Sequence, residues 1–161
     1  MAAPNLCGNT MEQHTAPDFE LPATGGATFK LSEHKGRGVV LYFYPKDNTP
    51  GCTTEGQDFS ALHAEFQALG WDIYGVSRDS LKAHENFKAK FAFPFWLLAD
   101  VDELVCELYG VMKLKNMYGK QVRSIERSTF AITPDGLLAR EWRGVKVPDH
   151  ARQVLDFVRS L

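Results

Sequence analysis

Six consecutive residues, Val39 to Tyr44, restrict the possible folds more than any other part of the sequence. All six are apolar or aromatic residues that favour β-structure, and Gly38 and Pro45 bound them. A strand in which apolar and polar residues do not alternate is typical of the centre of a sheet that is covered on both faces. Because helices supply that cover in most such proteins, the run predicts an α/β fold.

Periodicity in the rest of the chain predicts the elements around this strand. Apolar spacing and helix-bounding residues indicate helices over 53–69, 80–91, 102–109 and 148–160. Strands are expected over 72–77, 95–98, 129–132 and 137–142, and a short N-terminal β-hairpin over 16–31. This order predicts a mixed central sheet flanked by helices. The 161 residues fit one domain, expected over 15–161 behind a flexible polar tail over 1–14.

Composition and charge exclude several classes of function. The net charge of −2, with no block of basic residues, gives no reason to expect nucleic acid or an anionic membrane as a partner. No apolar stretch approaches the roughly 18 residues of a spanning helix, and the first residues do not resemble a secretory signal. Three cysteines, at positions 7, 52 and 106, are too few for a disulfide framework and favour a cytoplasmic protein.

Other conspicuous residues predict packing or solvated surface. The five histidines, at 14, 34, 63, 84 and 150, are widely separated, so we expect solvated or half-buried roles and no metal site. The aromatic residues at 91, 93, 95 and 96 are expected in the core. Lys113, Lys115 and Lys120 are expected in a solvated loop.

The segment from Tyr44 to Glu55 carries the chemistry. Cys52 falls in the first turn of a helix that follows the central strand, where free N–H groups and the helix dipole favour a thiolate. Thr49 can offer a hydroxyl to the sulfur or to a bound oxygen, and Pro45 restricts the loop through its fixed φ. Glu55, one turn further, can orient a cationic partner.

Cys52 also fits a structural interpretation as a small buried residue in a Pro/Gly turn. Its place at the strand-to-helix junction, with Thr49 nearby, favours reactivity. A Cys-x-x-Cys mechanism is excluded because the position three residues on is Glu55.

The pattern Pro45-x-x-x-Thr49-x-x-Cys52 resembles the active-site signature of the peroxiredoxins. The segments 42–46 and 49–53 resemble the branch of the bacterioferritin comigratory protein, also called peroxiredoxin Q. The resemblance begins at residues 16–19 and continues through 109–111, 118–120 and 126–130, so that only the tail before about Met11 lies outside it.

This resemblance implies a thioredoxin-like fold and a cofactor-free reduction of hydrogen peroxide or alkyl hydroperoxides to water or alcohol. It implies that Cys52 is the peroxidatic cysteine, that Thr49 holds the peroxide and that Pro45 shields the sulfur. Arg127 would pair with the thiolate and the peroxide oxygens, a task that suits a planar cation that never deprotonates. Without the resemblance, Arg127 would be interpreted as a surface arginine.

The residues that reduce the sulfenic acid depart from the family pattern. Many members of the branch carry a resolving cysteine five residues after the peroxidatic one, where this chain has Gln57, and others carry it on the next helix, where this chain has Lys88. Cys106 and Cys7 remain as possible resolving residues. If Val101, Leu104, Val105 and Leu108 form the buried face of the helix over 102–109, Cys106 points roughly 150° away from it. It would then be accessible or packed beneath another segment.

We therefore predict a single-cysteine thiol-dependent peroxidase, reduced by glutathione, a glutaredoxin or thioredoxin, and a monomer. Three alternatives remain open at this stage. They are a two-cysteine cycle with Cys106 or Cys7, a redox sensor or holdase switched by oxidation of Cys52, and a binding module in which Cys52 is inert.

Overall fold

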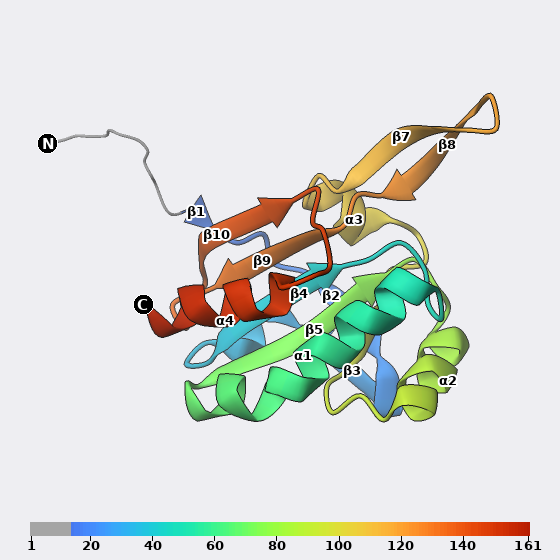
Figure 1. The fold of residues 1–161 in the computed structure, drawn as a ribbon. Helices are drawn as coiled ribbons and strands as arrows, with labels where there is room; N and C mark the ends of the chain where they lie inside the picture. Colours follow the sequence, from blue (N-terminus) through green and yellow to red (C-terminus); the bar gives the residue numbers. More distant parts are fainter. Residues whose placement is uncertain (1–13) are drawn as a thin grey trace, which may run out of the picture.

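The computed structural model describes residues 14–161, which form an eight-stranded mixed sheet, four α-helices and a separate two-stranded hairpin (Figure 1). The strand order in the large sheet is β1-β10-β9-β4-β5-β6-β2-β3. The strands are β1 (His14–Thr15), β2 (Glu20–Ala23), β3 (Ala27–Lys30), β4 (Gly38–Phe43), β5 (Trp71–Ser77), β6 (Leu97–Ala99), β7 (Met112–Met117), β8 (Lys120–Ile125), β9 (Ser128–Ile132) and β10 (Leu137–Arg143). The α-helices are α1 (Pro50–Ala68), α2 (Leu81–Phe91), α3 (Leu104–Leu108) and α4 (His150–Arg159).

Strand β4 lies at the centre of the sheet, as its composition predicts. It pairs in parallel with β5 and antiparallel with β9, and all six of its residues are buried. Successive side chains point to opposite faces. Val40 and Tyr42 pack in one hydrophobic cluster, with α1 and α4, whereas Leu41 and Phe43 pack in the other, with α3 and the N-terminal strands. Figure 1 shows α1 and α4 together in front of the sheet.

The predicted helices and strands are present, with small shifts at their ends. Helix α1 begins at Pro50, three residues before the predicted start, because proline suits the first helical position, where no backbone N–H is needed. Strands β2 and β3 form the expected hairpin, and β9 and β10 pair antiparallel across the turn after Ile132. Phe93 and Phe95 lie in the core as expected. No helix in residues 14–161 is long and apolar enough to cross a bilayer.

Two expectations at the ends and edges of the domain are wrong. His14, assigned from sequence to the tail, belongs to β1 and pairs with Leu138; residues 1–13 lie outside the described part of the chain. The lysines at 113, 115 and 120 lie on the strands β7 and β8 rather than in a loop. Tyr118 and Gly119 both have positive φ, which is the geometry of the two-residue turns that join hairpin strands. Gly119 is therefore the residue from which the β7–β8 turn could have been predicted.

Candidate active site

Cys52 is the third residue of α1 and only 2% of its surface is exposed. It lies at the carboxyl end of β4, because the chain leaves the sheet after Phe43 and enters α1 at Pro50. Thr49 caps the helix through its carbonyl, which accepts the Thr53 N–H at 2.8 Å, but its side chain caps no amide. The first amides of α1 therefore remain available to an anion.

Arg127 connects the sulfur to a buried carboxylate. It lies between β8 and β9, and its side chain is 16% exposed. Nη1 donates to Glu55 Oε1 at 2.6 Å and Nη2 donates to Cys52 Sγ at 3.5 Å. A Cβ on Gly51 would lie 3.1 Å from Nη2, so the absence of a side chain at this position lets the guanidinium approach the helix. Burial opposes the charge, yet Glu55 and Cys52 together hold the pKa of Arg127 above its usual value.

Glu55 is 1% exposed and is the acidic partner of Arg127 in an ion pair. Burial raises its pKa from 4.5 to about 7, against the opposing effect of Arg127. Its second oxygen, Oε2, is buried and has no hydrogen-bond partner. Glu55 therefore changes charge close to neutral pH, directly behind the guanidinium that contacts the sulfur.

The structure brings Cys52, Glu55 and Arg127 together, and places Thr49 and Pro45 in the segment that precedes them. Thr49 and Pro45 are both half-buried. The Thr49 hydroxyl donates to the Lys46 carbonyl at 2.8 Å rather than to the sulfur. That bond holds the hydroxyl within the loop and leaves its oxygen free to accept a hydrogen bond.

A buried network behind this loop was not predicted. His84 is completely buried, and its Nδ1 lies 2.7 Å from Asp47 Oδ2. Its Nε2 lies 2.9 Å from the Leu98 carbonyl, which can only accept, so Nε2 carries a proton. Tyr44 donates its hydroxyl to Asp47 Oδ1 at 2.6 Å. These bonds fasten the loop between Pro45 and Thr49 to α2 and β6.

The expectation that all histidines are solvated or half-buried is wrong for His84 and His150. His150 is 3% exposed, its Nε2 lies 2.8 Å from Thr129 Oγ1, and burial together with Arg127 lowers its pKa to about 4. Asp47, Asp79 and His84 place possible metal-ligand atoms within 4.8 Å of one another. Asp79 Oδ2, however, already accepts the Asp47 N–H at 2.9 Å and the Ser77 hydroxyl. Hydrogen bonds alone account for the cluster, and we assign it no metal.

Cys106 does not lie near Cys52. It is fully buried in the cluster that contains Leu41 and Phe43, whereas Cys52 belongs to the cluster on the opposite face of the sheet. Burial, followed by the neighbouring Asp100, raises the pKa of the Cys106 thiol far above its usual value. Both cysteines are free thiols.

The buried face assumed for α3 is right for Val105 and wrong for the two leucines. Leu104 and Leu108 are 71% and 50% exposed, while Val105 and Cys106 face the core. Asp100 accounts for this orientation, because its carboxylate accepts the N–H groups of both buried residues, at 3.2 and 2.7 Å. Cys106 is therefore packed beneath neighbouring segments. Cys7, the other possible resolving residue, lies outside the described residues.

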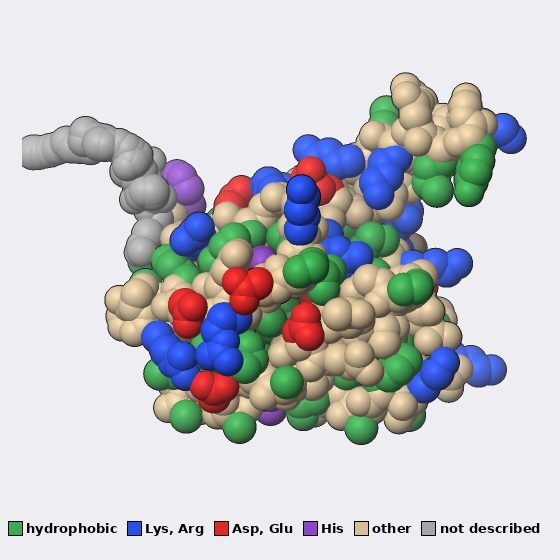
Figure 2. All heavy atoms as spheres, in the orientation of Figure 1, with side chains coloured by type: hydrophobic (Ala, Val, Ile, Leu, Met, Phe, Trp, Pro, Cys, Tyr) green, Lys and Arg blue, Asp and Glu red, His purple; other side chains and the backbone are tan. Residues whose placement is uncertain are grey.

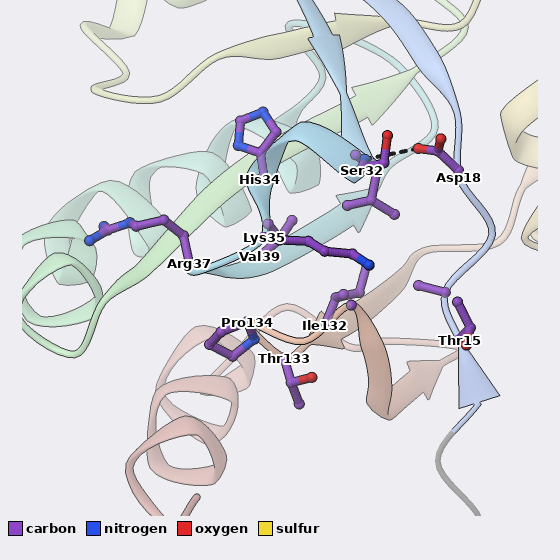
Figure 3. Close-up of a pocket in the computed structure, with 13 residues that line it drawn as sticks. Thr15, Asp18, Ser32, His34, Lys35, Arg37, Val39, Ile132, Thr133 and Pro134 are labelled. Atoms are coloured by element: carbon purple, nitrogen blue, oxygen red, sulfur yellow. Dashed lines mark hydrogen bonds between the residues drawn. The ribbon is translucent and has the colours of Figure 1, made fainter.

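A separate cavity of about 210 Å³ lies at the other end of β4 (Figure 3). Its lining includes Val39 and Ile132, which pair across β4 and β9 at the end of the sheet remote from Cys52, together with Lys35 and Asp18. The Asp18 carboxylate accepts a hydrogen bond from the Ser32 N–H at 2.9 Å. The cavity contains none of the predicted site residues.

Comparison with known proteins finds relatives over most of the chain. The AhpC/TSA family model matches residues 13–140. Peroxiredoxin Bcp of Xanthomonas campestris pv. campestris is 55% identical over 147 residues, covering 90% of this chain and 92% of that protein. Peroxiredoxin Bcp of Bacillus subtilis is 49% identical over 146 residues, covering 91% and 93%.

A solved structure of the Xanthomonas campestris bacterioferritin comigratory protein, described in connection with its alkyl peroxide reduction activity, is also similar. It matches with a TM-score of 0.85 and 52% identity, over 88% of this chain and 90% of that chain. The match confirms the expected thioredoxin-like α/β fold. Hydroperoxides and a thiol reductant are accordingly the reactants of this protein. The chain belongs to the AhpC/TSA family and is a peroxiredoxin of the Bcp, or peroxiredoxin Q, branch.

Proposed function

We propose that the protein reduces hydrogen peroxide and organic hydroperoxides with Cys52 as the peroxidatic residue. The observation that carries this proposal is the guanidinium of Arg127, which lies between the Cys52 sulfur and the Glu55 carboxylate. An inert structural cysteine would gain nothing from a buried cation held at 3.5 Å. The open helix amides beside Cys52 add further donors.

The reaction needs no metal or organic cofactor. The Cys52 thiolate attacks one peroxide oxygen in line with the O–O bond, and an S–O bond forms as the O–O bond breaks. Sulfur is oxidised to a sulfenic acid, and the leaving oxygen takes a proton to become water or an alcohol. Arg127, the helix amides and Thr49 stabilise the charge that moves from sulfur to that oxygen, while Pro45 limits the access of water.

We propose a single-cysteine mechanism with an external thiol as the reductant: glutathione, a glutaredoxin or thioredoxin. The central sheet separates Cys106 from Cys52, and a disulfide requires Cα atoms within about 7 Å. Cys7 is the alternative resolving residue. Free thiols at both described cysteines favour a reducing, cytoplasmic location. We further propose a monomer, with residues 15–161 as a single peroxiredoxin domain.

The test is intact mass and peptide mapping after a sub-second exposure to one equivalent of hydroperoxide. Gain of one oxygen on Cys52 supports the proposal, and loss of two hydrogens would identify an internal resolving thiol. If Cys52 stays unmodified while peroxide persists, the proposed activity is wrong. The Cys7→Ser/Cys106→Ser variant should retain turnover with a small thiol; loss of turnover with Cys52 still oxidised would refute the single-cysteine mechanism.

A further inference from the structure

The hairpin β7–β8 has a charge unlike that of the rest of the chain. Residues 112–125 contain Lys113, Lys115, Lys120 and Arg123 and no acidic residue, although the whole protein has a net charge of −2. Arg123 is paired with Glu103 and with Glu107 of α3. The three lysines are exposed, and no carboxylate in residues 14–161 pairs with them. The hairpin thus presents three uncompensated positive charges.

Apolar side chains lie exposed on the same hairpin and on the adjacent helix α3. Successive residues of a strand point to opposite faces, and the register of the hairpin places the three lysines on one face together with Met117 (46% exposed) and Val122 (41%). We call these five residues the hairpin patch. Leu114 is directly opposite Arg123 across the hairpin, and paired residues share a face. Because Arg123 bonds to Glu107, Leu114 lies on the face opposite the hairpin patch, which is turned towards α3 and its exposed Leu104 and Leu108.

The patch projects from the body of the molecule (Figures 1 and 2). An isolated two-stranded hairpin is only marginally stable in water. Contiguous apolar residues exposed on its surface mark a site of interaction with another molecule. Its base is anchored, because Ile125 is fully buried and the Glu126 N–H donates to the Val111 carbonyl at 2.7 Å. Two residues after Ile125 comes Arg127, whose guanidinium contacts Cys52. The hairpin therefore leaves the body of the protein within two residues of the arginine that contacts Cys52.

We propose that the hairpin patch is the docking surface for the protein that reduces Cys52, a dithiol oxidoreductase whose reactive thiol lies in an acidic surface with an apolar centre. This inference rests on the proposed function, in which the sulfenic acid must be reduced by an external thiol. The lysines attract the acidic surface, and Met117 and Val122 on the same face supply apolar contact area. A small thiol needs no such surface.

The docked partner reduces the Cys52 sulfenic acid in two steps, through a mixed disulfide. The partner's thiolate attacks the sulfur of the Cys52 sulfenic acid, and the S–O bond breaks as a mixed disulfide forms and water leaves. The partner's second thiol then attacks its own half of the mixed disulfide. Cys52 departs as a thiolate, and the partner is left oxidised as an internal disulfide.

The charge-reversal variant Lys113→Glu/Lys115→Glu/Lys120→Glu tests the proposal, with two reductants compared side by side. With a reduced thioredoxin of net negative charge, we expect kcat/KM to fall about tenfold or more at low ionic strength, because steering between opposite charges is lost, and the deficit to shrink as salt is added. With dithiothreitol we expect no change. The matched control, Lys35→Glu/Lys82→Glu/Arg152→Glu, makes the same change in net charge at exposed sites elsewhere.

Met117→Ser tests the apolar part of the surface and should raise KM for the thioredoxin alone. The proposal is overturned if the hairpin and control variants lose thioredoxin activity equally, or if dithiothreitol activity falls in parallel. It is also overturned if the hairpin variant loses binding to anionic phosphatidylglycerol vesicles while its thioredoxin kinetics are unchanged. A wild-type protein without turnover in dithiothreitol would instead refute the proposed function itself.

Discussion

Replacing Arg127 with lysine isolates the contribution of one guanidinium nitrogen. Nη1 contacts Glu55 at 2.6 Å and Nη2 contacts the Cys52 sulfur at 3.5 Å. Lysine keeps the charge but offers a single nitrogen, which the nearer carboxylate retains. Arg127→Lys should therefore keep the ion pair and lose the donor at the sulfur. Loss of one preorganised donor costs about 10²–10³ in rate, or about 3–4 kcal/mol. We expect the rate constant for Cys52 oxidation to fall by that factor.

The assay mixes the reduced protein with hydroperoxide, quenches with an alkylating agent at increasing times and measures oxidised Cys52 by intact mass. Arg123→Lys is the matched control, because it alters an arginine with two carboxylate partners outside the site and should leave the rate unchanged. Urea unfolding should show that Arg127→Lys remains folded. A rate within about threefold of the wild type would refute the assigned role of the second nitrogen.

Three further substitutions test the buried groups. Burial holds the pKa of Glu55 at about 7, above its 4.5 reference, so its contribution to stability is full below pH 4.5 and is lost as the pH rises through 7. His150, whose pKa is lowered to about 4, titrates in the opposite sense over part of this range in both proteins, so the comparison is between the two curves. Urea titrations should show the free energy of unfolding of the wild type falling by about 3 kcal/mol relative to that of Glu55→Gln as the pH rises from 4.5 to 7, and equal slopes would contradict the assignment. Tyr42→Phe removes a buried hydroxyl that has no partner and should raise the free energy of unfolding by about 1 kcal/mol, whereas a decrease would mean that the hydroxyl is bonded. His84→Ala leaves Asp47 buried without its partner and should cost about 3–5 kcal/mol, and the double variant with Asp47→Asn should cost less than the sum of the two single variants.

Sequence patterns predicted those parts of the fold that depend on neighbouring residues alone. The run from Val39 to Tyr44 could only be a strand covered on both faces, and Cys52 had to fall at the helix start after Pro50. The place of Arg127 is different, because 75 residues separate it from Cys52 and no periodicity connects them. Only the resemblance to the peroxiredoxins indicated that contact.

His84 shows a signal that was present but not used. It shares a helix face with Phe87 and Phe91, at spacings of three and seven residues, and His84 and Phe87 on that face are buried. A histidine on an apolar face requires polar partners, yet its partner Asp47 lies 37 residues away in a loop. The sequence could therefore reveal the burial of His84 but not the residue that compensates it.

Helix α3 was misoriented for a physical reason. Hydrophobic periodicity identifies the buried face of a helix only if most of its apolar residues are buried. In a helix of five residues, two exposed leucines are enough to make the pattern misleading. Here the Asp100 carboxylate fixes the orientation by accepting two N–H groups, so that Leu104 and Leu108 face solvent.

The separation of the two described thiols by the central sheet has a practical consequence. Cys106 is enclosed on its face of the sheet, so a labelling reagent reaches it only when the core around Leu41 and Phe43 opens. In the Cys7→Ser background, the slow labelling of Cys106 therefore measures the free energy of that opening, while Cys52 in the same molecule records events at the catalytic surface. One time course can thus separate damage to the chemistry from loss of the fold, without an added probe.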